Sequence, residues 1–160
     1  MKTIKICVIS FVLLSFLSCN SDKVVFQNYK AFNKNQWHAD SVVKFSFLNT
    51  DTLSQHEIEL KIRHTVDYEY RNLFLFYQND IKTDTLEVLL ADKRGKWYGK
   101  GIGDIREVSV IVERQKFNNK KEIKYVLEQA MRYGKKEKII RLQNLNSIGL
   151  RIIKKNKLTI

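Results

Sequence analysis

The chain has no proline, six glycines and two cysteines among its 160 residues. Proline is one common protection for exposed strand edges, and its absence leaves many turns to Asn, Asp and Lys. Cys7 lies in an N-terminal segment that we expect to be removed, so the exported chain keeps one cysteine and forms no internal disulfide. The stability of the domain must therefore come from packing.

The first 19 residues have the pattern of a secretory signal. A positively charged start precedes the uncharged run Ile6–Leu17, which is shorter than the about 20 residues that span a bilayer. Ser18 is the small residue expected just before the cleavage site, and Cys19 follows it directly. This order resembles the bacterial lipoprotein signal, in which the cysteine is lipidated and becomes the first mature residue. Ordinary cleavage would leave a secreted protein with a free cysteine, but an aromatic Phe16 suits such a site poorly.

The net positive charge of the exported chain limits the classes of molecule that it is expected to bind. Removal of Lys2 and Lys5 with the leader lowers the net charge from +12 to +10. A basic cytosolic chain would suggest nucleic acid, but export and the lack of a nucleic-acid-binding signature argue against that partner. Anionic lipid, polysaccharide or an acidic protein is a more plausible partner for an exported basic chain. Plain solvated surface remains the simpler interpretation of the lysine clusters.

Composition divides the chain into three segments. Residues 1–18 are the predicted lipoprotein signal peptide, residues 19–36 the lipidated N-terminus and tether, and residues 37–160 the folded domain. Within the tether, Val24, Val25 and Phe26 are a candidate first strand. The length from residue 37 onward suits one domain with a sizeable core.

From residue 41 onward, apolar residues recur with period two, which is typical of β-strands. Ile58, Leu60 and Ile62 alternate with charged residues and predict a half-buried strand. The segment 73–77 is apolar on both faces, as expected in the middle of a packed sheet. The segment 123–131 fits a strand or a helix, and its parity favours a strand. Further candidate strands lie around Val43–Phe47, Leu86–Leu90, Val108–Val112 and Ile148–Ile152. We predict an all-β fold, an antiparallel β-sandwich of about eight strands.

No catalytic, cofactor-binding or metal-ligating set emerges from the sequence. The acidic residues Asp84, Glu87, Asp92 and Asp104 show no spacing that singles out a pair for glycoside hydrolysis. His56 and His64 share a strand face but lie eight residues apart, roughly 26 Å at about 3.3 Å per residue. One metal ion cannot bridge that distance on a straight strand. We therefore expect no enzyme activity, no cofactor and no metal.

Glycines and aromatic residues gather in one region. The segment Gly99–Gly103 lacks the context of a phosphate-binding loop, so we interpret it as a bulged or closely approached strand. Asp92–Gly95 is a predicted turn, in which Gly95 supplies a positive φ. Tyr68 and Tyr70 share a face, whereas Trp97 and Tyr98 point to opposite sides of their strand. Such rings either fill and cover the core, which we favour for Trp97, or stack on a sugar or a protein partner.

Five segments form a longer pattern in order along the chain: Asp67–Leu75, Asp84–Glu87, Leu90–Asp104, Glu128–Arg132 and Ile148–Ile152. With the lipoprotein start they resemble the gliding-motility lipoprotein family GldH of the Bacteroidetes, and the segment Gly95–Gly101 is the most specific part. The family usually has proline where Glu69 stands and again near Asn118. The resemblance implies a cell-envelope lipoprotein required for gliding and linked to the type IX secretion system. No catalytic residue, cofactor or mapped binding surface comes with it.

Our hypothesis is a non-enzymatic envelope lipoprotein, an accessory component of the gliding motility and type IX secretion apparatus. Acyl chains such as palmitate on Cys19 anchor it, with the outer membrane favoured over the inner. We expect other envelope proteins of this machinery as partners. The alternative is a glycan- or ligand-binding surface lipoprotein that uses Tyr68, Tyr70 and Tyr98. The candidate interaction surface consists of Tyr68, Tyr70, Asp92, Gly95, Trp97, Tyr98 and Asp104.

Overall fold

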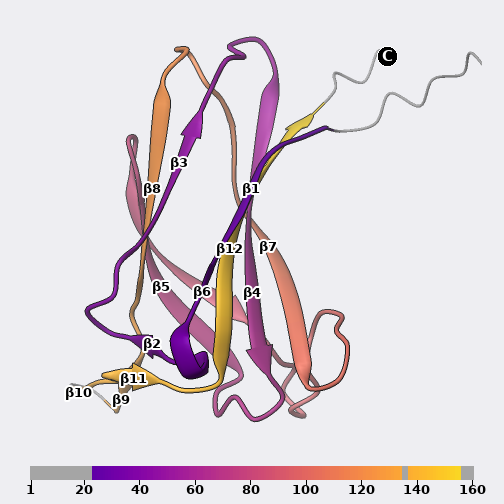
Figure 1. The fold of residues 1–160 in the computed structure, drawn as a ribbon, viewed down its shortest axis with the longest axis vertical. Helices are drawn as coiled ribbons and strands as arrows, with labels where there is room; N and C mark the ends of the chain where they lie inside the picture. Colours follow the sequence, from indigo (N-terminus) through magenta and orange to yellow (C-terminus); the bar gives the residue numbers. More distant parts are fainter. Residues whose placement is uncertain (1–22, 135–136, 156–160) are drawn as a thin grey trace, which may run out of the picture.

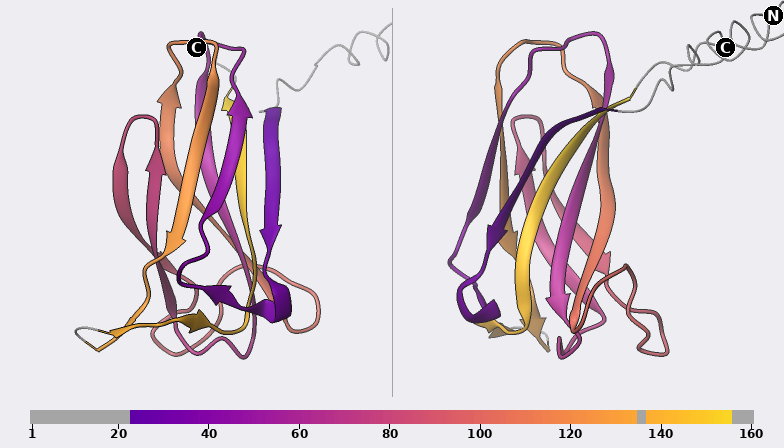
Figure 2. Two further views of the ribbon diagram at one scale, coloured as in Figure 1. Left: turned by 60° about the vertical axis from the view of Figure 1, so that its left-hand side comes forward. Right: turned by 45° about the vertical axis from the view of Figure 1, so that its right-hand side comes forward.

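Two four-stranded antiparallel sheets face each other in the computed structural model, which describes residues 23–134 and 137–155 (Figure 1). The predicted all-β sandwich is confirmed. Figure 2 shows the two layers in two further views. Buried residues of both sheets form one hydrophobic cluster, the core. The predicted signal peptide and Cys19 lie outside the described residues.

The first sheet has the strand order β1-β12-β4-β7. Its inner face carries Ile58, Leu60 and Ile62 of β4 and Ile148 and Leu150 of β12, all fully buried. Alternate residues of a strand point to opposite faces, so this periodicity places one apolar row on the core. The strands are β1 (Lys23–Ala31), β12 (Leu145–Lys155), β4 (Gln55–Thr65) and β7 (Ile105–Lys116).

The second sheet has the order β3-β8-β5-β6. Strand β5 lies between two neighbours, as its apolar sequence predicted, but only its inner face is buried. Phe76 on the outer face is 40% exposed, because no other described element covers this side of the sheet. The segment that fitted either helix or strand is strand β8. The bounds are β3 (Val43–Leu48), β8 (Glu122–Gln129), β5 (Asn72–Asn79) and β6 (Thr83–Leu89).

Short elements close the end of the sandwich at which β1 finishes. Trp37 is fully buried there, stacks on Phe32 with ring centroids 4.7 Å apart, and donates its indole N–H to the Ser41 carbonyl at 2.8 Å. The described residues contain no helix of the length and hydropathy that a membrane-spanning helix needs. The elements are η1 (Asn33–Asn35), β2 (Trp37–His38), β9 (Arg132–Tyr133), β10 (Glu137–Lys138) and β11 (Arg141–Leu142).

Strand β1 occupies much of the segment predicted as a tether. It pairs with β12 from Lys23, opposite Lys154, to Ala31, opposite Ser147, with one register shift after Val24. The first strand that Val24, Val25 and Phe26 indicated is therefore present and extends further. Strand β1 thus lies within the segment predicted as a tether, because backbone pairing with β12 stabilises a segment whose side chains are mostly exposed.

The glycine-rich segment 99–103 approaches a neighbouring strand closely, as its sequence indicated. A Cβ at Gly99 would overlap the Glu107 carbonyl, and a Cβ at Gly101 would overlap that of Ile105. Lys100 and Glu107 exchange backbone hydrogen bonds at 2.8 and 3.3 Å across this approach. The loop between β6 and β7 is thereby held against the start of β7.

Gly95 and Gly99 offer a matched test of this approach. Their φ angles are +80° and +79°, but a Cβ at Gly95 would meet nothing within 4 Å. Gly95→Ala should lower the free energy of unfolding by about 1 kcal/mol, the cost of a left-handed conformation. Gly99→Ala should cost at least about 2 kcal/mol, because it adds a clash with backbone. Urea unfolding measures both, and equal losses would contradict the close approach.

Candidate interaction surface

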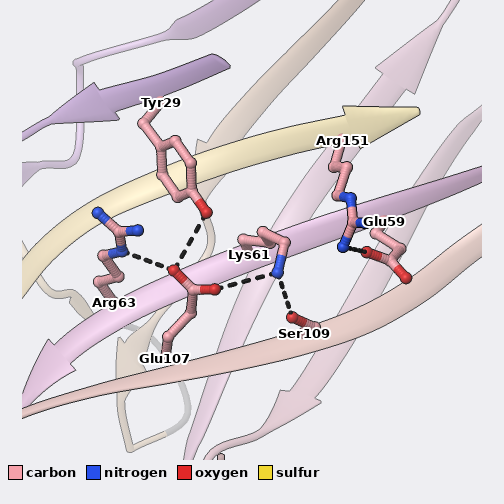
Figure 3. A network of polar contacts seen from close by, with 7 residues as sticks. All are labelled: Tyr29, Glu59, Lys61, Arg63, Glu107, Ser109 and Arg151. Atoms are coloured by element: carbon pink, nitrogen blue, oxygen red, sulfur yellow. Dashed lines mark hydrogen bonds and ion pairs between the residues drawn. The ribbon is translucent and has the colours of Figure 1, made fainter. Parts of the chain in front are cut away.

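A carboxylate on the outer face of the first sheet collects hydrogen-bond donors from two other strands. Glu107 on β7 accepts from Arg63 Nε at 2.6 Å and Lys61 Nζ at 3.0 Å, both on β4, and from Tyr29 Oη on β1 at 3.1 Å. Lys61 Nζ also donates to Ser109 Oγ at 2.8 Å. Figure 3 shows these side chains converging on Glu107. The network connects β1, β4 and β7 over the surface of β12.

Gly149 on β12 allows Tyr29 to reach this network. The two residues are paired across β1 and β12, and Gly149 is in turn paired with Lys61 on β4. A Cβ at Gly149 would lie 2.6 Å from the Tyr29 ring, so only glycine leaves room for the ring to lie over β12. The Arg63 guanidinium then sits 4.2 Å from the ring centroid, a cation–π distance.

The electrostatics keep Glu107 ionised. Burial raises its pKa, but hydrogen bonds from Arg63 and Lys61 lower it by more, and the pKa lies below its ordinary value. Burial and the nearby carboxylate raise the pKa of Tyr29. Both Glu107 oxygens accept hydrogen bonds from side chains of the same sheet, and the lowered pKa makes this carboxylate a weak base. The arrangement therefore holds strands together.

Two further ion pairs lie on the outer face of the same sheet. Arg151 on β12 lies 3.5 Å from Glu59 on β4, and Arg114 on β7 lies 2.9 Å from Glu57 on β4. Glu57 is buried although it belongs to the polar row of β4. The half-buried strand predicted here is thus covered on both faces, because charged neighbours pack over its outer side.

Three aromatic residues of the predicted surface meet around a buried histidine. Trp97 and Tyr68 lie with ring centroids 4.6 and 5.7 Å from that of His64, and Tyr70 packs on Tyr68 at 5.7 Å. Tyr68 is only 3% exposed, and Trp97 and Tyr70 are half-buried against the core. Tyr68 therefore offers no ring face to a sugar, so the glycan-binding alternative loses one of the three tyrosines on which it was based.

The acidic and glycine positions of the predicted surface shape its loop. Asp92 accepts the backbone N–H groups of Arg94 at 2.8 Å and Lys96 at 2.9 Å, and Gly95 occupies the left-handed position of that turn. The carbonyl of Asp104 accepts the Val66 N–H at 2.8 Å. These residues build the loop, as the predicted turn at Asp92–Gly95 required.

Tyr98 differs from the other three aromatic residues because 44% of its surface is exposed. It lines an open groove of about 460 Å³ between β6 and β7, the two edge strands on this side of the sandwich. The groove floor is apolar at Val88 and Val108, and Leu89 is exposed at its rim. The remaining lining residues are Glu87, Gly99, Ser109 and Val110.

The other candidate chemical groups do not converge in the described part of the chain. Each of three acidic residues is engaged locally: Asp84 with Lys82, Glu87 with Asn72, and Asp92 with its own turn. His56 and His64 occupy opposite ends of β4. No group of three or more His, Cys, Asp or Glu side chains among the described residues is arranged to hold a metal ion.

Glu113, an acidic residue whose side chain faces the core, was not identified from the sequence. Glu113 lies beyond an irregularity in the register of β7 with β4, and it accepts hydrogen bonds from Tyr77 Oη and Asn79 Nδ2, both at 2.9 Å. Burial and this carboxylate raise the pKa of Tyr77. In β7 the alternation of apolar and polar residues stops after Val112. This interruption is the sequence feature that could have indicated the inward orientation of Glu113.

The Glu107 network predicts a defined pH dependence of stability. Its depressed pKa means that its contribution is complete above the ordinary value of 4.5 and is lost as the pH falls through the lower folded pKa. Glu107→Gln should lower the free energy of unfolding by about 2 kcal/mol at pH 7. The difference from the parent should shrink below pH 4.5. Urea unfolding across pH 3–7 measures this, with the exposed Glu87→Gln as the control; a constant difference would contradict it.

Gly149 predicts a non-additive pair of substitutions. Gly149→Ala should lower the free energy of unfolding by about 1–3 kcal/mol, because the new methyl displaces the Tyr29 ring. In a Tyr29→Ala background the same change should cost less than about 1 kcal/mol. A double-mutant cycle by urea unfolding measures the coupling, and additive losses would show that the ring does not depend on the glycine.

Comparison with known proteins identifies relatives along nearly the whole chain. Residues 24–152 match the family model described as GldH lipoprotein. The gliding motility lipoprotein GldH homolog of Christiangramia forsetii is 34% identical and covers 90% of this chain and 91% of the relative. The gliding motility lipoprotein GldH of Flavobacterium johnsoniae is 32% identical over 87% of this chain and 89% of its own length.

A solved structure of a family 115 4-O-methyl-α-glucuronidase is similar over 85% of this chain and 18% of its own, with 13% identity and a TM-score of 0.43. A TM-score this low supports no conclusion about the present chain. The match to the family model and the two relatives agree with the lipoprotein signal and the motifs that end at Ile152. This chain belongs to the GldH lipoprotein family, whose members are gliding motility lipoproteins.

Proposed function

We propose that this protein is anchored in the cell envelope by lipid on Cys19 and acts there without catalysis. In this role it is an accessory component of the gliding motility and type IX secretion apparatus, held in the outer membrane. The observation that carries the proposal is the family membership together with the lipoprotein signal ending at Cys19. A diacylglycerol thioether places two acyl chains on one residue, which is enough for stable anchoring.

The proposed mechanism is local concentration. Anchoring confines the domain to one membrane, so that weak contacts with other anchored proteins become well populated. The rigid sandwich then presents its loops at a fixed place above the lipid. No reacting group is required for this role.

The partner contact that we propose uses the exposed part of the predicted surface. Tyr98, Gly95 and Asp104 lie on the exposed loop between β6 and β7, beside the groove that separates these strands. Tyr68 and Trp97 support this loop from beneath through His64. An exposed tyrosine over an apolar groove is a common anchor in protein interfaces.

Cys19→Ala tests the anchor. The variant should incorporate no fatty-acid label and should fail to restore spreading or type IX cargo export in a deletion strain, because the domain is no longer held at the membrane. Metabolic labelling with an alkynyl fatty acid and a spreading assay measure both effects. Continued labelling would exclude Cys19 as the lipidated residue, and unchanged spreading and export in the deletion strain would contradict the motility role.

A photo-crosslinking residue at position 98 tests the contact surface. It should capture an envelope protein in intact cells, whereas the same residue at Val42 should not. The two positions are matched in exposure, at 44% and 42%. Mass spectrometry identifies the captured protein. Equal capture at both positions, or capture at Val42 alone, would contradict the proposed surface.

A further inference from the structure

The chain enters the sandwich at one end, which we call the anchored end. It consists of Lys23 at the start of β1, residues 154–155 at the end of β12, and the loops 49–54, 80–82 and 117–121. Figure 1 shows the start of β1 and the end of β12 in the same half of the molecule as the loops that join β3 to β4 and β7 to β8, below the tips of these loops. The ion pair of Lys154 with Asp51 connects the end of β12 to the first of these loops. Hydrogen bonds join these loops, since the Asn49 N–H and its Nδ2 donate to the carbonyls of Lys121 and Asn119 at 2.9 and 2.8 Å.

The covalent distance from Cys19 to this end is short. Four residue steps separate Cys19 from Lys23, and a fully extended chain covers at most about 3.6 Å per residue. The two Cα atoms therefore lie no more than about 14 Å apart. If lipid on Cys19 anchors the protein, the loops of the anchored end are held close to the lipid headgroups.

Two of these loops present an aliphatic side chain to solvent in the same way. Leu53 is 76% exposed and Ile81 is 71% exposed. The backbone N–H of Leu53 donates to Asp51 Oδ1 at 2.8 Å, and that of Ile81 donates to Asn79 Oδ1 at 2.9 Å. Each side chain therefore follows two residues after an Asx residue whose oxygen fixes the turn. The loops thus hold their apolar side chains outward instead of folding them onto the core.

Lysines lie on the loops and strand ends of the same end, and Lys116 lines a shallow pocket together with Ile81. The acidic residues of this end are already paired: Asp51 with Lys154, Asp80 with Lys121 at 2.9 Å, and Glu122 with Lys124 at 3.9 Å. Three exposed lysines have no carboxylate of the described residues within ion-pair distance, namely Lys23, Lys116 and Lys120. Unpaired ammonium groups beside exposed aliphatic side chains match the phosphates and acyl boundary of an anionic lipid surface.

We propose that the anchored end docks on the surface of an anionic phospholipid membrane, with Leu53 and Ile81 in the interfacial layer and the lysines over the phosphates. This proposal rests on the proposed anchoring through Cys19. Exposure alone does not single out this end, because Ile102 is 94% exposed on the loop between β6 and β7. That loop lies at the other end of the twelve-residue β7, about 36 Å away at about 3.3 Å per residue. Chain connectivity therefore decides which end meets the lipid.

The test uses the full lipidated protein in vesicles of phosphatidylglycerol and phosphatidylethanolamine. Leu53→Cys, Ile81→Cys and, as the matched control, Ile102→Cys each carry an NBD fluorophore. The labelling is specific, because the thioether consumes the Cys19 thiol and Cys7 leaves with the leader. Doxyl-labelled lipid should quench the probes at 53 and 81 at least threefold more than the probe at 102.

A second pair of variants tests the lysines. Lys116→Glu with Lys120→Glu should reduce the lipid quenching at residue 53 at least twofold. Lys93→Glu with Lys96→Glu, two exposed lysines on the loop that carries Ile102, should leave it unchanged. Unchanged quenching in the first pair would overturn the electrostatic part of the proposal.

The outcomes separate the docking from the anchoring. A protein that floats with vesicles but shows equal quenching at 53 and 102, or more at 102, overturns the docking alone. A protein that does not float overturns the anchoring at Cys19 and the docking with it. A probe at 53 that leaves water only as the protein concentration rises, without lipid, would indicate a second copy at this end and would overturn membrane docking.

Discussion

The backbone pairing of β1 with β12 is the constraint on which the rest of the structure depends. It begins at Lys23 opposite Lys154 and continues to Ala31 opposite Ser147. The pairing completes the first sheet and leaves only a short link to Cys19. It also fixes which end of the sandwich lies nearest that cysteine. A tether of 18 residues would have left the orientation of the domain free, whereas the paired strand restricts it.

The pairing also explains the charge arrangement on the outer face of the first sheet. Because β1 is in register, Tyr29 lies over Gly149 and reaches Glu107 on the far side of β4. One carboxylate thereby pairs with both Lys61 and Arg63 and connects three strands. On this face of the first sheet, Glu57, Glu59 and Glu107 are all paired with basic side chains of the same sheet. At the anchored end the acids are paired as well, whereas Lys116 and Lys120 have no carboxylate of the described residues within ion-pair distance.

Strand periodicity and motif order predicted most of the fold and the family, because half-buried strands carry their burial pattern in their sequence. The predicted length of strand β1 was too short. This strand lies at a sheet edge, where polar side chains interrupt the alternation of apolar and polar residues. The side chains that bind Glu107 come from strands far apart in the sequence, so no local sequence pattern predicts these contacts. The alternation of residues along a strand left open whether Tyr68 is exposed to a partner. In the structure, contact with His64 and Trp97 buries its ring. The segment Gly99–Gly103 did indicate a close approach of two backbones, whereas the contact that Gly149 allows was not predicted.

The central claim is that the paired β1 holds the sandwich directly at the lipid surface. Neutron reflectometry of the lipidated protein on a supported anionic bilayer tests it most directly, because it measures protein density along the membrane normal. We predict that protein density begins at the headgroup layer, with no solvent-filled layer between them. A solvent-rich layer of about 20 Å, the coil dimension expected of an 18-residue flexible tether, would contradict the account.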